Sequence, residues 1–138
     1  MNVVRMRRRV DAPPERVAER VRDVVPFLEA AGFDSVDREG NDVHIENRVG
    51  VLGIELTLQL VEEPDTALAY EQRDGVFESM RTTYRIVPDS DGSEVIAETA
   101  FALDVAVVGD FLDATVIERQ RKKELSAQFD YLEALETK

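Results

Sequence analysis

The sequence contains no cysteine and only one histidine, His44. The absence of cysteine excludes disulfide scaffolds, thiol catalysis, iron–sulfur clusters and zinc sites built from Cys and His. His44 falls on a predicted strand whose neighbours Val43 and Ile45 take the opposite face, so we expect it to be exposed. A lone histidine also makes a poor catalytic triad or metal centre. We therefore expect no metal site and no cofactor.

Long apolar runs are also missing. No run approaches the roughly 20 residues that cross a bilayer, and the N-terminus has no charged segment followed by an apolar leader. The 138 residues, of which 43% are hydrophobic, suit one domain with a core of its own. We expect a single domain over 1–138, soluble and cytoplasmic, with no integral membrane segment; the oligomeric state stays open.

Basic residues are outnumbered, 17 against 29 acidic ones, which gives a formal charge of -12. Lysine is especially scarce, with only Lys122, Lys123 and Lys138. A surface of this sign repels phosphate, which argues against a nucleic-acid partner. Carboxylate excess with little lysine is typical of a halophile, whose acidic side chains keep the protein hydrated in concentrated salt. We interpret the charge as an adaptation to solvent.

The N-terminal third predicts one strand and two helices. Residues 2–10 alternate as a strand does, and the Asp11-Ala12-Pro13-Pro14-Glu15 segment is typical of a helix start, with proline in the first turn. Pro26 is expected to interrupt this helix. Residues 27–31 then predict a second short helix, which Gly32 closes.

After Phe33 the hydrophobic period changes to two, which indicates an antiparallel meander. From Val105 to about Glu136 the period is helical again. Strand, two helices, six strands and a long helix indicate the α+β class, with helices on one face of an antiparallel sheet. The predicted strands after the two helices are 33–38, 42–48, 53–63, 67–73, 78–88 and 94–104.

Alternation sorts each strand into two faces, and the inner face is apolar but contains hydroxyl groups. Binding pockets have this composition, although ordinary cores also contain some Thr and Tyr. A sheet curled around the long helix leaves a space that these side chains fill or line. The candidate lining residues are Leu58, Tyr70, Met80, Tyr84, Phe101, Phe111 and Phe129.

Four charged residues fall at positions where the pattern expects apolar ones. Projecting the apolar stripe of the long helix backward from Leu125 leads to Lys122 and Glu118. These two side chains either enter a wet cavity or lie in solvent, and we favour solvent because burying unpaired charge costs several kcal/mol. Arg8 and Glu78 raise the same question on the strands: they contact a polar ligand group if they face inward and are surface charges otherwise. Arg8, Glu78 and Glu118 are the candidate polar contacts.

From residue 2 to residue 136 the chain resembles the START/SRPBCC superfamily, which includes the birch pollen allergen and proteins called polyketide cyclase/dehydrase. The resemblance rests on the opening strand, the Ala12-Pro13-Pro14-Glu15 helix start, the antiparallel strands and the closing amphipathic helix. It implies a helix-grip fold, in which a seven-stranded sheet grips the C-terminal helix around a hydrophobic cavity. Members bind lipids, polyketides, quinones or other bulky apolar molecules, and no catalytic motif of the family carries over to this sequence.

Three functions remain open. The first hypothesis is a non-catalytic carrier of a small hydrophobic molecule (lipid, polyketide, quinone or isoprenoid-like). The second is a cyclase/dehydrase-type enzyme that uses the same cavity, with a Tyr or Glu as acid or base. The third is a protein-binding module with an incidental cavity.

Overall fold

The computed structural model describes residues 1–103 and 113–136, and it confirms the α+β class and the seven-stranded antiparallel sheet. No helix among these residues is long and apolar enough to span a membrane. The elements are β1 (Asn2–Val10), α1 (Pro14–Arg22), α2 (Val24–Glu29), β2 (Ser35–Glu39), β3 (Asp42–Val49), β4 (Leu52–Leu60), β5 (Leu68–Asp74), β6 (Phe77–Asp89), β7 (Gly92–Leu103) and α3 (Ala114–Glu136).

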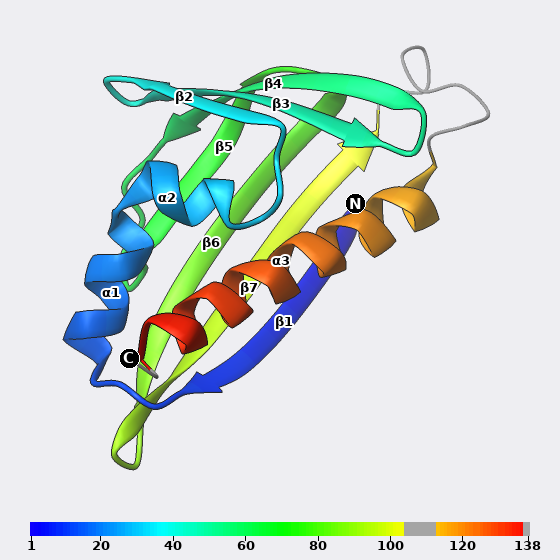
Figure 1. The fold of residues 1–138 in the computed structure, drawn as a ribbon. Helices are drawn as coiled ribbons and strands as arrows, with labels where there is room; N and C mark the ends of the chain where they lie inside the picture. Colours follow the sequence, from blue (N-terminus) through cyan, green and yellow to red (C-terminus); the bar gives the residue numbers. More distant parts are fainter. Residues whose placement is uncertain (104–112, 137–138) are drawn as a thin grey trace.

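The strands form one sheet in the order β1-β7-β6-β5-β4-β3-β2, and every neighbouring pair is antiparallel. Figure 1 shows the helices on one side of this sheet, with α3 running diagonally in front of β7 and β1 while β3 and β4 curve over its N-terminal part. The core lies between the sheet and the helices. The opposite face of the sheet carries no helix among the described residues.

The strands follow the predicted alternation closely. In β7, the side chains of Val95, Ala97, Thr99 and Phe101 are buried, and those between them are half-buried. Because successive side chains on a strand point to opposite faces, this pattern places the buried set against the helices. The inner face of the sheet is therefore the one that the sequence indicates.

The first two helices divide three residues earlier than predicted. The break is at Asp23, whose ψ of 77° leaves the helical range, and not at Pro26. Pro26 is the third residue of α2, where its missing N–H would have had no partner within the helix. Phe27 and Leu28 then enter the core, both with no exposed surface.

The C-terminal half of α3 is fixed to the first strand. The Arg8 guanidinium extends from β1 to Asp130 Oδ1 at 2.8 Å and to Glu133 Oε2 at 3.3 Å, and it lies 5.4 Å from the centre of the Phe129 ring. These contacts set where α3 crosses the sheet. The part of the predicted helix before Asp113, together with Phe111, lies outside the described residues.

Candidate functional site

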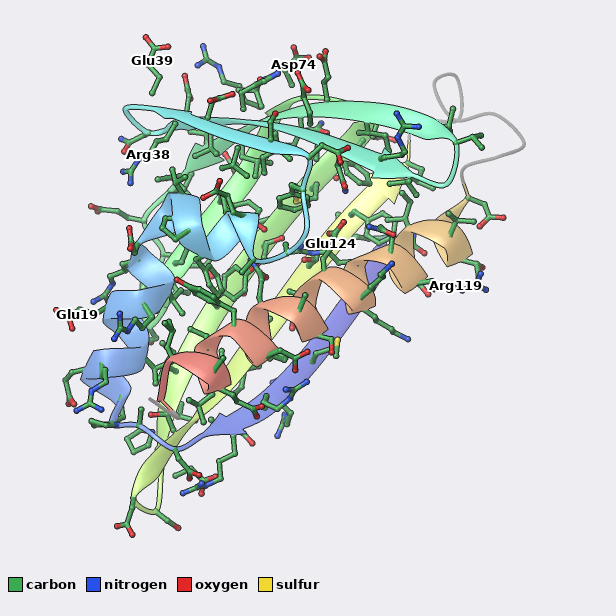
Figure 2. The ribbon with its side chains drawn as sticks, viewed as in Figure 1. Glu19, Arg38, Glu39, Asp74, Arg119 and Glu124 are labelled. Atoms are coloured by element: carbon green, nitrogen blue, oxygen red, sulfur yellow. The ribbon has the colours of Figure 1, made fainter. Side chains whose placement is uncertain are left out.

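The middle of α3 buries charged and polar side chains. Arg121 and Glu124 are 8% and 5% exposed, and Gln128 has no exposed surface. In Figure 2, Glu124 lies on the side of α3 that faces the strands, whereas Arg119 lies on its outer side. The backward projection of the apolar stripe was therefore wrong by one residue: Lys122 is exposed as favoured, but this turn also carries a charge pair into the interior.

Arg121 connects α3 to three neighbouring strands. Its Nε donates to Thr99 Oγ1 at 2.9 Å, and its Nη2 donates to Tyr70 Oη at 2.8 Å and to Tyr84 Oη at 3.1 Å. Tyr70, Thr82 and Thr99 stand opposite one another on β5, β6 and β7 and form one row across the inner face. The guanidinium thus lies over a row of hydroxyl groups that strand alternation and register bring together.

The charge of Arg121 is balanced by Glu124 on the same helix. Arg121 Nη1 donates to Glu124 Oε1 at 3.1 Å. The other carboxylate oxygen accepts from Asn47 Nδ2 of β3 at 2.8 Å and from Gln120 Nε2 at 3.1 Å. A buried ion pair is tolerated when further hydrogen bonds satisfy both partners, and this pair meets that condition.

Burial alone lowers the pKa of Arg121, because desolvation disfavours the charged form. Electrostatic interactions with Tyr70, Tyr84 and Glu124 outweigh this effect and raise the pKa of Arg121 above its ordinary value. Arg121 therefore keeps its charge inside the protein.

Tyr84 and Gln128 extend the network away from Arg121. Tyr84 Oη donates to Gln128 Oε1 at 2.7 Å, and Gln128 Nε2 donates to the Phe27 carbonyl oxygen at 3.1 Å. Burial, followed by the Coulombic effect of Tyr70, raises the pKa of the Tyr84 hydroxyl well above its usual 10. Tyr84 is therefore a neutral phenol in the folded protein at all physiological pH values.

A pocket lies between this network and the curved strands β3 and β4. The volume inside the pocket that the centre of a water molecule can occupy is about 60 Å³. The pocket reaches the surface where its half-buried residues lie, among them Phe33, Leu56 and Gln120. Most of the lining is apolar, and the polar groups lie on α3, on the sheet row beneath and, with Asn47, on β3. The full lining is Phe33, Ile45, Asn47, Val49, Ile54, Leu56, Leu58, Tyr70, Phe77, Met80, Thr99, Phe101, Ile117, Gln120, Arg121 and Glu124.

The structure brings together part of the predicted lining. Leu58, Tyr70, Met80 and Phe101 line the pocket. Tyr84 is fully buried but lies behind the lining, where it contacts Tyr70 and Arg121. Phe129 is also fully buried, under Arg8.

The predicted polar contacts lie away from the pocket. Arg8 faces inward but binds the far end of α3, and Glu118 is half-buried outside the lining. Glu78 is exposed, because the pairing of β6 with β7 shifts register between Phe77 and Ser79 and leaves Glu78 as the extra residue of a bulge. Glu78 is therefore a surface charge, which is the second of its two alternatives.

Asn47, Gln120, Arg121 and Glu124 were not predicted to line the pocket. The sequence does indicate which stripe of α3 is buried, because Ile117 is the one apolar residue in the 117–124 segment. Three- and four-residue steps from Ile117 lead to Arg121, Glu124 and Gln128, which is the observed buried stripe. Nothing in the sequence indicates that Asn47 reaches Glu124, because that contact depends on how the sheet curves.

His44 lies on the outer face of the sheet and is half-buried, with Nδ1 3.4 Å from Thr57 Oγ1. His44, Glu46 and Glu55 offer ligand atoms that all lie within 4.8 Å of one another among the described residues. Groups of this kind are common on exposed strands without any ion. Their spacing alone assigns no metal to this face.

Comparisons with known proteins agree with this geometry. The family described as "Polyketide cyclase / dehydrase and lipid transport" matches residues 1–135. The Zhui aromatase/cyclase from Streptomyces sp. R1128 has a TM-score of 0.75 and 20% identity, covering 96% of this chain and 93% of its own. A START superfamily protein from Mycobacterium smegmatis has a TM-score of 0.71 and 13% identity, covering 96% of this chain and 94% of its own.

A third solved structure, TTHA0849 from Thermus thermophilus, has a TM-score of 0.74 and 18% identity, covering 97% of this chain and 99% of its own. At these identities the likeness shows the fold alone. No curated protein matches the chain.

Replacing Arg121 by Met should lower the free energy of unfolding by about 3–5 kcal/mol, because the Glu124 carboxylate loses its cation while staying buried. The double variant Arg121→Met/Glu124→Leu should recover much of that loss, because the uncompensated charge is gone. Urea unfolding of the two single variants and the double variant measures the coupling. Arg119→Met, on the exposed side of the same helix, should change the value by no more than about 0.5 kcal/mol. Additive single effects would contradict the pairing.

Alkaline pH should destabilise the protein through Tyr84. Because the pKa of Tyr84 is higher in the folded than in the unfolded chain, its contribution is complete below about pH 10. Above that pH the unfolded chain releases the proton first, so stability falls by up to about 1.4 kcal/mol per pH unit from this group. The free energy of unfolding, measured from pH 8 to 11, should fall more steeply in the wild type than in Tyr84→Phe. Equal slopes would show that Tyr84 ionises normally.

Proposed function

The chain belongs to the polyketide cyclase/dehydrase and lipid transport family, and on this premise we propose that it binds and carries a small hydrophobic molecule in the pocket between β3, β4 and α3. Lipids, polyketides, quinones and isoprenoid-like molecules all belong to this chemical class. One observation carries the proposal: an apolar pocket ends in a preorganised set of polar side chains. Ligand sites combine a largely apolar wall with a few placed polar groups in this way.

The polar side chains at the end of the pocket are held in fixed positions. Arg121 and Glu124 are buried and held by hydrogen bonds to β3, β5 and β7 and to Gln120 of their own helix, so their positions are fixed before any ligand arrives. Core packing alone does not require this arrangement, because hydrophobic residues of similar volume are commonly as stable as a buried ion pair. A role in orienting a ligand accounts for the charged pair and for its place in a pocket wall.

The free volume requires the pocket to widen when a ligand enters. About 60 Å³ holds a few water molecules and is smaller than the roughly 150 Å³ of a cavity that binds benzene. Met80 is suited to give way, because its unbranched side chain changes rotamer readily. The Asn47–Glu124 hydrogen bond joins β3 to α3 across the pocket, so widening also stretches this contact.

Replacing Ile117 by Trp should fill the pocket and lower the affinity for p-cresol at least tenfold, because Ile117 lines the pocket from α3. Thr115→Trp, an exposed position on the same helix, is the matched control and should bind p-cresol as the wild type does. The measurement is NMR of ¹³C-methyl methionine, since the chain has three methionines and Met80 alone lines the pocket. If p-cresol leaves the Met80 signal unmoved, or shifts it equally in both variants, the carrier hypothesis fails.

A catalytic function is the second candidate, and the contact between Tyr70 and Arg121 favours it. Tyr70 lines the pocket, and Arg121 Nη2 donates to its oxygen at 2.8 Å. A phenol with a guanidinium at this distance is arranged to give a proton to a ligand oxygen, as dehydration after ring closure requires. The Streptomyces neighbour is an aromatase/cyclase, which supports the same chemistry on this fold.

The triketone 2,4,6-heptanetrione tests the catalytic function. Its cyclisation forms a C–O bond from an enol oxygen to a ketone carbon, and the resulting hydroxyl leaves as water to give 2,6-dimethyl-4-pyrone. If Tyr70 supplies the proton to the leaving hydroxyl, Tyr70→Phe should lower kcat about a hundredfold with KM changed less than threefold. Absorbance of the pyrone measures the rate. A wild type that gives no acceleration, or equal rates in both proteins, excludes this role of Tyr70.

A further inference from the structure

We propose that the pocket selects uncharged ligands that carry a hydroxyl or carbonyl oxygen, and that it rejects carboxylates although an arginine lines it. This inference rests on the proposed function and names the ligand class for the same pocket. It depends on two properties of the polar end: the charge of Arg121 is already neutralised, and one hydroxyl proton, that of Tyr70, is left for a ligand.

The charged groups that line the pocket among the described residues are Arg121 and Glu124, and their charges cancel. A carboxylate that enters loses its hydration and meets the negative charge of Glu124 as well as the positive charge of Arg121. Desolvation of an anion is repaid only by a partner that is free to bind it. The pocket therefore offers an anionic ligand no net electrostatic attraction that would compensate for its lost hydration.

Four of the five N–H groups of Arg121 are also occupied, which leaves one N–H on Nη1. Nε, Nη1 and Nη2 donate to Thr99, Glu124 and the two tyrosines. Arginine binds carboxylates strongly when its planar fork presents two parallel N–H groups to them. Here Nη2 is directed to two phenol oxygens, so this fork is not presented to the pocket.

The direction of the remaining hydrogen bonds is fixed at a backbone carbonyl. The Phe27 oxygen can only accept, so it orients the Gln128 amide with Nε2 toward itself and Oε1 toward Tyr84. Tyr84 must then donate its single proton to Gln128, over 2.7 Å. In the 3.4 Å contact between the two tyrosines, Tyr70 is therefore the donor.

At 3.4 Å that contact is long for a bond between two hydroxyl groups, which is normally about 2.5–3.0 Å. The Tyr70 proton is consequently free to turn to a better acceptor in the pocket that Tyr70 lines. A ligand carbonyl or hydroxyl oxygen is such an acceptor. The amide oxygens of Asn47 on β3 and Gln120 on α3 line the same pocket and accept no hydrogen bond among the described residues, so they can accept one from a ligand hydroxyl.

Four one-ring probes of nearly equal size test this selection on the wild-type protein: toluene, p-cresol, p-toluamide and p-toluate. The Met80 methyl signal reports binding of each. We expect p-cresol to bind about three- to tenfold more tightly than toluene, the effect of one hydrogen bond between uncharged groups. The amide and the carboxylate have the same shape and differ in charge, and we expect p-toluate to bind at least tenfold more weakly than p-toluamide.

Two variants assign the selection to residues. Tyr70→Phe should reduce the affinity for p-cresol to that for toluene and leave toluene within twofold. Glu124→Gln, which leaves Arg121 unbalanced, should raise the affinity for p-toluate about tenfold. Glu133→Gln is the matched control, because it removes an acidic charge from the far end of α3, where Glu133 pairs with Arg8. It should not change any of the four affinities.

The outcomes separate the two proposals. If p-toluate binds as tightly as p-toluamide, or toluene as tightly as p-cresol, the selection is wrong while binding itself stands. If none of the four probes shifts the Met80 signal, the proposed function fails and the selection with it. The comparison of p-toluamide with p-toluate needs no variant, so it decides the question even if Glu124→Gln does not fold.

Discussion

The rest of the site depends on a guanidinium group buried between a helix and a sheet. A charge in the interior has to be balanced and hydrogen-bonded, or the fold loses several kcal/mol. Arg121 meets this requirement only in one rotation of α3, because its partners Thr99, Tyr70 and Tyr84 stand on fixed strands. Its counter-ion Glu124 is likewise bound to Asn47 of β3. The requirement therefore sets the rotation of the helix about its own axis. Apolar packing along a long helix would leave that rotation less sharply specified.

Strand alternation and helix phase differ in how well the sequence predicts them. On a strand the two faces follow from the parity of residue numbers, so the inner positions of β7 and the presence of hydroxyl groups on the inner face could be predicted, whereas their alignment in one row depends on the strand register. On α3 the choice lies between two stripes only one residue apart, and within the 117–124 segment Ile117 is the one apolar residue that distinguishes them. Glu78 shows the limit on strands, because a bulge changes the parity and no turn residue marks it.

The two sides of the pocket have different structural origins. The apolar side belongs to the hairpin of β3 and β4, which curves over the N-terminal part of α3, and to the neighbouring aromatic and aliphatic side chains. The polar side belongs to α3 and to strands β5, β6 and β7, where register sets the positions of the hydroxyl groups. A ligand that lies between them packs against apolar side chains on one side and is oriented by hydrogen-bonding groups on the other. The single contact of Asn47 with Glu124 joins these two halves.

The open outer face of the sheet has a consequence for how this chain can change. Along each strand the side chains alternate between the inner and the outer face of the sheet, so a substitution on the outer face leaves the inner face unchanged. Among the described residues Glu124 is the one buried acidic side chain. The acidic excess therefore lies on the outer face of the sheet, on the turns and on the outer sides of the helices. Surface residues can thus be substituted to suit a different solvent while the pocket keeps the same chemistry. Pocket residues can equally be substituted while the surface charge stays the same.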